Sequence, residues 1–241
     1  MKAFLLAAGE GTRLRPITNS IPKCLVPICG KPMLGIWLEL CRRSGIDEVL
    51  VNLHAHADAV RRFLSEHDFG VNIRTSEEPE LLGSAGTLFA NRQWVELEPY
   101  FWVFYADVLT NMDLGAMRVC HERFAMAATL GVYKVPDPSR CGIAQVDKRG
   151  IVHKFVEKPA TPMGSLAFSG VMIMCREVIR ELPTTAPTDL GFDVIPRLGG
   201  RMVAYRIREY LLDIGTMANY ERAQISWPGL RRRQRAESSH L

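Results

Sequence analysis

The chain has 241 residues, 47% of them hydrophobic and 23% charged, which is an ordinary globular composition with enough length to bury one substantial core. No apolar run approaches the roughly 18 residues that a membrane span needs, and the apolar stretch at the N-terminus is too short for a signal peptide. We therefore expect a cytoplasmic protein without a membrane partner. The formal net charge is +4, and the four arginines of the segment 231–235 account for about all of it.

A short charged run at a chain end is typical of a solvated segment, so residues 229–241 are predicted to form a basic, disordered tail without a nucleic-acid partner. The histidines at 54 and 56 lie two apart on a predicted strand without a third ligand, so we expect them to be structural. The cysteines occur singly among apolar neighbours, without a CxxC pair, which predicts reduced packing residues. They are Cys24, Cys29, Cys41, Cys120, Cys141 and Cys175.

The first half of the chain alternates between strand and helix patterns. Leu34, Trp37 and Leu38, for example, recur at helical spacing. Such alternation predicts a mainly parallel sheet covered on both faces, with ligands beyond the carboxyl ends of its strands. A glycine-rich loop after the first strand and Asp107 after the fourth lie at such ends. The expected strands are 2–7, 47–54, 71–78 and 101–108, and the expected helices are 33–44, 56–70 and 83–95.

The second half of the chain is richer in strand patterns, separated by turn signals such as PDPSRCG and DKRG. No internal repeat or linker is visible, so we expect one domain over residues 1–228. The expected strands are 130–135, 142–147, 151–159, 165–174, 202–207 and 210–214, followed by a closing helix over 216–225.

The loop LAAGEGTRLRPIT combines two glycines with two arginines. Glycine lets backbone N–H groups approach a ligand closely, and arginine supplies forked donors for phosphate oxygens. No Gly-Lys-Ser/Thr follows, so it is not a Walker loop, and Leu14 occupies the third glycine position of a dinucleotide fingerprint. The alternative is a tight turn that needs the glycines only for its backbone geometry. The following PKCLVPICGKP adds Lys23 and Lys31, and this number of cations in one loop favours a polyphosphate ligand.

Residues 5–32 resemble the signature of the sugar 1-phosphate nucleotidylyltransferases, LAAGxGTRLxPLT followed by PKxLxPxxGKP. The resemblance covers roughly residues 1–226 and implies a Rossmann-like α/β fold of the nucleotide-diphospho-sugar transferase type. That fold has a mixed, mainly parallel sheet flanked by helices, here without the C-terminal β-helix of several larger relatives. It also implies transfer of a nucleoside monophosphate from an NTP to a sugar 1-phosphate. Arg13 would polarise the NTP phosphates, and Lys23 would contact the phosphate under attack.

Two aspartates resemble the metal-binding residues of this family. Asp107 lies in FYADVLTNMDL, and Asp213 lies in YLLDIGTMANYERA, which is similar to the family segment DIGTPxxYxxA. Phosphoryl chemistry on NTPs recruits Mg²⁺, which one or two carboxylates hold together with substrate oxygens. The resemblance therefore implies a Mg²⁺ cofactor, although either aspartate alone could instead be a helix cap.

The sugar-phosphate site is implied by three further segments. IVHKFVEKP matches the family pattern FxEKP and assigns sugar hydroxyls to Glu157 and the sugar phosphate to Lys158. RCGIAQVD resembles YGxxxxD, with Gly142 as a sugar contact and Cys141 in place of tyrosine. FSGVMIM, with Gly170, resembles NAGxYxF but departs from its asparagine, so the resemblance leaves the sugar open.

The segment EPELLGSAGTL is similar to the ExPLGTAGxL of relatives that use GTP with mannose or heptose phosphates, which makes GTP the leading nucleotide. Uridylyl and thymidylyl transfer remain alternatives within the family. The residues expected to bind or adjoin the nucleotide are Leu6, Ala8, Gly9, Gly11, Thr12, Arg13, Glu80, Gly83 and Gly86.

Two hypotheses from other classes stay open. A catalytically silent regulatory subunit that binds sugar nucleotides would keep the fold, but it has no reason to keep Arg13, Lys23, Asp107 and Asp213 together. A nicotinamide oxidoreductase is disfavoured by Leu14. The expected partners are thus the NTP and the sugar 1-phosphate, and a homo-oligomer is an open alternative to a monomer.

Overall fold

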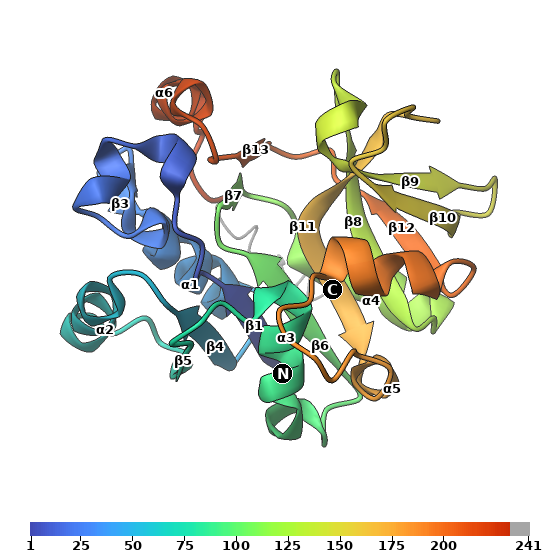
Figure 1. Ribbon diagram of the computed structural model, residues 1–241, viewed down its shortest axis with the longest axis horizontal. Helices are drawn as coiled ribbons and strands as arrows, with labels where there is room; N and C mark the ends of the chain where they lie inside the picture. Colours follow the sequence, from blue (N-terminus) through green and yellow to red (C-terminus); the bar gives the residue numbers. More distant parts are fainter. Residues whose placement is uncertain (232–241) are drawn as a thin grey trace, which may run out of the picture.

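A nine-stranded sheet runs through the computed structural model, which describes residues 1–231 (Figure 1). The strand order is β5-β4-β1-β6-β11-β8-β12-β10-β9. The N-terminal half of the sheet is parallel and consists of β1 (Lys2–Leu6), β4 (Glu48–Leu53), β5 (Asn72–Glu77) and β6 (Tyr100–Tyr105). This half matches the strands expected from the sequence to within one residue at each end, except that the expected strand 101–108 ends at Tyr105.

Antiparallel pairing dominates the C-terminal half of the sheet. β11 (Leu166–Cys175) runs antiparallel to β6 and to β8 (Ala128–Lys134), and β12 (Met202–Arg206) returns parallel to β8. β10 (Ile151–Glu157) and β9 (Gly142–Val146) complete the edge as an antiparallel pair. The sheet is therefore mixed, and the expected α/β class is confirmed.

Helices cover both faces of the sheet because neighbouring strand residues point to opposite sides. Ala3 and Leu5 face the cluster that includes α1 (Met33–Arg43), α2 (Ala57–Glu66) and α4 (Leu114–Phe124). Phe4 faces the cluster that includes α3 (Gly83–Ala90) and the short α5 (Arg176–Ile179). Two hydrophobic layers thus hold the sheet, one on each face.

Three helical features differ from the sequence expectations. The predicted helix 56–70 ends at Glu66, because His67 takes an extended conformation. The predicted helix 83–95 is α3 followed by a separate 3-10 turn, Arg92–Val95. The helix α4 was not predicted. Its buried side includes His121, which interrupts the apolar pattern, although Asp113 caps its first turn at 2.9 Å from the Ala116 N–H.

Two short ladders lie apart from the main sheet, along the upper edge in Figure 1. β7 (Val108–Thr110) pairs with β13 (Leu211–Asp213), next to α6 (Met217–Ser226). β2 (Pro27–Ile28) pairs with β3 (Lys31–Pro32). These ladders join the glycine-rich loop and the C-terminal segment to the end of the sheet where the strands β1 and β6 finish.

Part of the predicted tail lies within the described residues. The carbonyl of Gly229 accepts a hydrogen bond from Asn111, and that of Arg231 accepts one from Arg43. Residues 232–241 lie outside the described part of the chain, so the disorder of the tail stays a prediction. All six cysteines are free thiols. Within residues 1–231, no helix combines the length and apolar character that a bilayer span requires.

Candidate active site

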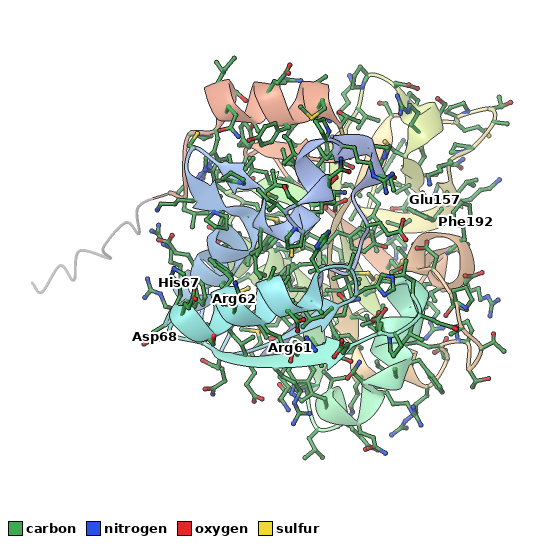
Figure 2. All side chains as sticks on the ribbon, turned by 60° about the vertical axis from the view of Figure 1, so that its left-hand side comes forward. Arg61, Arg62, His67, Asp68, Glu157 and Phe192 are labelled. Carbon is green, nitrogen blue, oxygen red and sulfur yellow. The ribbon has the colours of Figure 1, made fainter. Side chains whose placement is uncertain are left out.

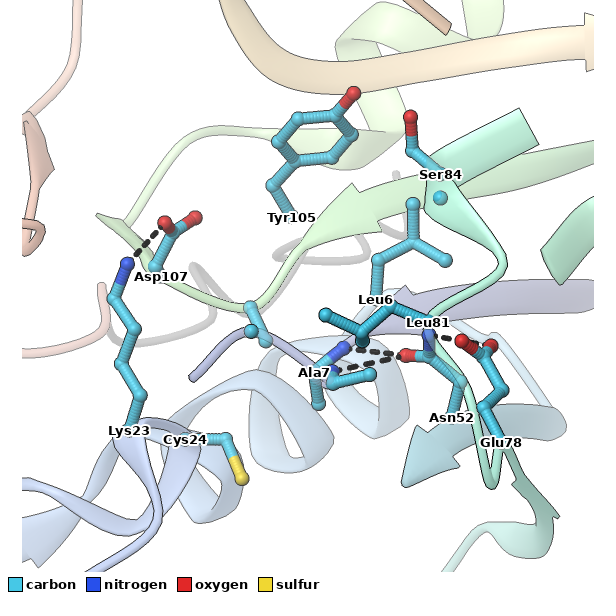
Figure 3. Close-up of a pocket in the computed structure, with 14 residues that line it drawn as sticks. Leu6, Ala7, Lys23, Cys24, Asn52, Glu78, Leu81, Ser84, Tyr105 and Asp107 are labelled. Atoms are coloured by element: carbon cyan, nitrogen blue, oxygen red, sulfur yellow. Dashed lines mark hydrogen bonds and ion pairs between the residues drawn. The ribbon is translucent and has the colours of Figure 1, made fainter. Parts of the chain in front are cut away.

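Three adjoining cavities open beyond the carboxyl ends of β1 and β6. The first cavity, of about 240 Å³, lies between the end of β1 and the start of α3, and Leu6, Ala8, Gly9 and Gly83 contribute to its wall (Figure 3). The second, of about 340 Å³, extends toward β9, β10 and β11. The third, of about 280 Å³, lies against the loop residues Gly11 to Arg13. Asp107 borders the first two, and Lys23 borders the first and third.

A buried polar network supports the floor of the first cavity. The Asn52 side-chain oxygen accepts hydrogen bonds from the N–H groups of Ala7 at 2.6 Å and Ala8 at 3.3 Å. Its amide nitrogen donates to Glu78 at 2.9 Å and to Thr87 at 3.1 Å. Asn52, Glu78 and Thr87 are 4%, 2% and 0% exposed. A network this deeply buried fixes the backbone that surrounds a ligand, because leaving any member unpaired is costly.

The glycine-rich loop folds tightly around the third cavity. Gly11 has a positive φ of 67°, and a Cβ at this position would lie 2.9 Å from Thr18 and 3.0 Å from Lys23. The Thr18 hydroxyl donates to the Gly11 carbonyl at 2.8 Å. Glycine is therefore required both for the backbone conformation and for the close passage of the Lys23 side chain.

Lys23 and Asp107 form an ion pair where the three cavities meet. The ammonium lies 2.5 Å from one carboxylate oxygen, and the two side chains are 12% and 28% exposed. Figure 3 shows Lys23 reaching across the cavity to Asp107 from a segment far away in the chain. Asp107 thus holds the lysine ammonium beside the space that a phosphate would occupy.

The β7–β13 ladder brings Asp107 and Asp213 together. Asp213 pairs with Val108, and the Ile214 N–H donates to the Asp107 carbonyl at 2.8 Å. Desolvation of Asp213 in the cleft, followed by the negative charge of Asp107, raises the pKa of Asp213 above its ordinary value, while nearby cations oppose the shift. Burial and the neighbouring Asp107 carboxylate thus both make the ionised form of Asp213 less favourable.

This charge balance fits a divalent cation. Among residues 1–231, no group of three or more His, Cys, Asp or Glu side chains is arranged to hold a metal, which leaves a two-carboxylate centre. Mg²⁺ accepts this kind of site because it takes one or two protein carboxylates and completes its shell with waters and substrate phosphates. Asp107 and Asp213 are the residues that would hold it.

Arg13 adjoins the same centre. A Cβ on Gly215 would lie 2.5 Å from an Asp213 oxygen and 3.1 Å from a guanidinium nitrogen of Arg13. The absence of a side chain at Gly215 thus lets the arginine and the aspartate approach one another. Arg13 borders both the second and the third cavity, so it lies between them.

The second cavity contains a carboxylate with free acceptor capacity. Within the described residues, the Glu157 carboxylate accepts no hydrogen bond, and it lies close to Phe192, an aromatic side chain that is 57% exposed (Figure 2). Desolvation raises the pKa of Glu157 above its ordinary value; Lys158 opposes the shift and Asp189 adds to it. The Lys158 ammonium lies 5.5 Å from the centre of the Phe192 ring. The cavity therefore combines carboxylate oxygens that can accept hydrogen bonds, a cation and an aromatic wall.

The structure brings most of the residues singled out in the sequence into these cavities, but not all of them. Gly142 and Gly170 border the second cavity with Glu157 and Lys158. Glu80 is exposed and borders none of the three cavities, whereas Glu78, two residues earlier, borders the first. Gly86 is buried in α3, and its N–H donates to Thr188. Lys31 is 72% exposed and pairs with Glu39, away from the cavities.

A family model described as nucleotidyl transferase matches residues 2–227. The chain belongs to this family. It is 31% identical over 221 residues to the mannose-1-phosphate guanylyltransferase catalytic subunit beta of Xenopus tropicalis, covering 89% of this chain and 61% of that protein. It is 34% identical over 244 residues to a UTP--glucose-1-phosphate uridylyltransferase of Synechocystis, covering 92% and 62%. The chain thus spans less than two thirds of the length of these curated relatives.

The fold of this nucleotidyl transferase also matches solved structures. The crystal structure of HddC from Yersinia pseudotuberculosis superposes with a TM-score of 0.78 over 93% of this chain and 98% of that chain, at 24% identity. The resemblance predicted from residues 5–32 is confirmed at the level of the family and the fold.

Several residues around these cavities were not found from the sequence. Asn52 is a polar residue at the end of the apolar strand VLVNL, and that position was the available signal. Glu78 was hidden by two other acidic residues within 77–80. Ser84 and Asp189 are 105 positions apart and are joined by a 2.8 Å hydrogen bond, which no local pattern predicts.

Proposed function

We propose that this protein transfers a nucleoside monophosphate, with GTP as the favoured donor, to a sugar 1-phosphate, giving a nucleoside diphosphate sugar and pyrophosphate. One observation carries this proposal. The first and second cavities share Tyr105 and Asp107, and the cations Lys23 and Arg13 lie at this junction. A nucleotide in one cavity and a phosphorylated acceptor in the other would meet beside these two cations.

The reaction that fits this geometry is an in-line displacement. An oxygen of the sugar 1-phosphate attacks the α-phosphorus of the NTP, a new P–O bond forms, and the bond from the α-phosphorus to the bridging oxygen breaks. Pyrophosphate leaves with the bonding pair. The nucleophile is already an anion, so no residue needs to act as a general base. Positioning and charge neutralisation then account for catalysis, with Lys23 beside the α-phosphate and Arg13 toward the leaving pyrophosphate.

The two carboxylates Asp107 and Asp213 support a requirement for Mg²⁺. The ion would supply a Lewis acid that neutralises phosphate oxygens during the displacement. Asp107 and Asp213 would hold the ion, and the Lys23 ammonium, 2.5 Å from Asp107, would lie beside the substrate phosphate.

Guanine is the base that we favour for the first cavity. The sequence similarity to relatives that use GTP agrees with this choice. Uridylyl transfer is the alternative, since the curated relatives include both guanylyl and uridylyl enzymes.

The acceptor cavity fits a ring with hydroxyls on one side and an apolar face on the other. Glu157 offers unpaired acceptor oxygens, and Phe168 and Phe192 supply aromatic surface. Phe168 packs edge-on against Tyr105 with ring centres 5.8 Å apart, at the place where the family pattern has asparagine. Hexose and heptose 1-phosphates, mannose included, are the proposed acceptors.

The test is pyrophosphate release with GTP, UTP, dTTP, CTP and ATP, each against a panel of hexose and heptose 1-phosphates, with Mg²⁺ and with EDTA. We expect release with GTP and one acceptor that stops in EDTA and returns when Mg²⁺ is added. Release with UTP alone would refute the choice of base. Nucleotide binding without release from any pair would refute the transferase and favour the regulatory subunit.

Two matched variants distinguish a loss of activity at the site from a loss of folded protein. Asp213→Asn should abolish metal-dependent release, because it removes one of the two carboxylates. Asp58→Asn changes a side chain on α2 that is 95% exposed, and it should leave pyrophosphate release unchanged. Equal loss in both variants would show that the assay reports stability and not the site.

A further inference from the structure

The first and second cavities are joined by a hydrogen-bonded contact between two distant segments. The segments are the start of α3, residues 82–86, and the turn 188–192, which begins beside α3 and ends in the second cavity. Gly83 and Ser84 border the first cavity. Asp189, Gly191 and Phe192 border the second. The contact between them is therefore shared by both.

Ser84 and Asp189 lie at the centre of this contact. The Ser84 hydroxyl donates to one Asp189 oxygen at 2.8 Å and accepts from the Leu190 N–H at 2.7 Å. The other Asp189 oxygen accepts from the N–H groups of Gly191 at 2.7 Å and Phe192 at 3.2 Å. One carboxylate thus holds the nucleotide-side serine with one oxygen and shapes the acceptor-side turn with the other.

Backbone hydrogen bonds fix the rest of the contact. The Thr188 carbonyl accepts from Ala85 at 3.0 Å and Gly86 at 3.3 Å, and the Thr188 N–H donates to Leu82 at 2.9 Å. Thr188 is 9% exposed. The otherwise unpaired N–H groups of the first turn of α3 are therefore satisfied by the turn that carries Asp189. The two segments are expected to move together.

This turn also lies close to Glu157. A Cβ placed on Gly191 would be 2.6 Å from a Glu157 oxygen and 3.1 Å from an Asp189 oxygen, so both carboxylates lie within about 3 Å of one point. A shift of Asp189 would displace Gly191 and with it the wall against the proposed hydroxyl acceptor. A continuous chain of contacts thus leads from the first cavity through Ser84 and Asp189 to Gly191, which lies against Glu157.

We infer that Ser84 and Asp189 are positioning residues whose hydrogen bond couples occupancy of the nucleotide cavity to the shape of the acceptor cavity. A nucleotide that fixes Ser84 also fixes the turn 188–192, and so raises the affinity for the acceptor. The coupling is reciprocal, because each ligand must change the affinity of the other by the same factor. The inference rests on the proposed function for the identity of the ligands, but the contact itself does not depend on it.

The first test needs no substrate. Amide hydrogen exchange of residues 188–192 is compared in the wild type, Ser84→Ala, Asp189→Asn and Ser84→Thr, the last of which keeps the hydroxyl. We expect at least tenfold faster exchange at Gly191 and Phe192 in Ser84→Ala and Asp189→Asn, and wild-type exchange in Ser84→Thr. Unchanged exchange in Ser84→Ala would overturn the inference whatever the activity of the protein.

The second test measures the coupling. Calorimetry gives the dissociation constant of mannose 1-phosphate with and without α,β-methylene-GTP, whose bridging carbon prevents transfer. We expect the analogue to tighten acceptor binding about tenfold in the wild type and in Ser84→Thr, and less than twofold in Ser84→Ala. In the double variant Ser84→Ala/Asp189→Asn the analogue should likewise tighten acceptor binding less than twofold, because Ser84→Ala alone already breaks the contact between the two residues.

The outcomes separate the two proposals. Equal enhancement in the wild type and Ser84→Ala, or additive effects in the double variant, would overturn the coupling. Failure of the wild type to bind either probe would count against the proposed function, while the exchange experiment would still decide whether Ser84 fixes the turn.

Discussion

Replacing Asn52 by alanine tests the polar network beneath the first cavity. The change removes the acceptor for the N–H groups of Ala7 and Ala8 and one donor to Glu78, while Thr87 keeps its own bond to Glu78. Asn52 and Glu78 are 4% and 2% exposed, so the bond that Asn52 donates to Glu78 lies out of reach of bulk solvent. Both stability and nucleotide binding should suffer.

The expected loss can be estimated from the groups left unpaired. A buried donor or acceptor without a partner costs about 1–3 kcal/mol, and more when it is charged. The Ala7 N–H borders the cavity and can recover a water, which leaves the Glu78 carboxylate as the larger penalty. We expect the free energy of unfolding to fall by about 3 kcal/mol, equivalent to a drop in Tm of about 6–12 °C for a domain of this size.

Urea denaturation and calorimetry measure this loss, and a titration with GTP measures nucleotide affinity. Asn72→Ala, an exposed asparagine on β5, is the matched control and should change the free energy of unfolding by no more than about 0.5 kcal/mol. A loss below about 1 kcal/mol in Asn52→Ala would refute the view that the network holds the floor of the cavity. The view would also be refuted if the free energy of unfolding fell by the expected amount while the nucleotide affinity of the folded variant stayed unchanged.

Three further predictions concern the catalytic centre. Lys23→Ala should lower kcat about 10²–10³-fold with a smaller change in KM, because its charge matters most in the transition state, whereas the exposed Lys31→Ala should leave kcat unchanged; a larger effect on KM would contradict this. Gly215→Ala should lower kcat/KM at least tenfold in steady-state assays, because its Cβ would lie 2.5 Å from Asp213; wild-type activity would show that the centre can widen. Glu157 has a raised pKa in the folded state, so its ionisation opposes folding: the stability it contributes is present below its unfolded pKa and is lost as pH rises through the folded pKa. Thermal denaturation should therefore show Glu157→Gln to be more stable than the wild type at pH 7.5 but not at pH 4, and equal Tm differences at both pH values would refute the assignment.

Periodicity and motif spacing were sufficient for the parallel half of the sheet and for the glycine-rich loop. In that half, the apolar runs are short, continuous and separated by clear turn residues, and Arg13 and Lys23 lie within one segment of the sequence. Asp107 and Asp213 were singled out because each lies at the end of an apolar run, and the structure brings the two together, while their role in metal binding stays a prediction.

What the sequence did not reveal depends on contacts between distant segments. The network around Asn52 and the contact of Ser84 with Asp189 satisfy buried polar groups across 26 to 105 positions. No local pattern records which segments will meet. The same limit explains the choice of Glu80 over Glu78, because two acidic residues so close in the chain differ only in the direction that the folded backbone gives them.

The ladder that joins Asp107 and Asp213 is only three residues long on each strand. Because β13 comes late in the chain, the proposed pair of carboxylates exists only in molecules in which β13 is docked. Release of β13 would separate Asp213 from Asp107 while leaving the nine-stranded sheet folded. Under the proposed function, activity on heating should therefore disappear before the secondary structure does.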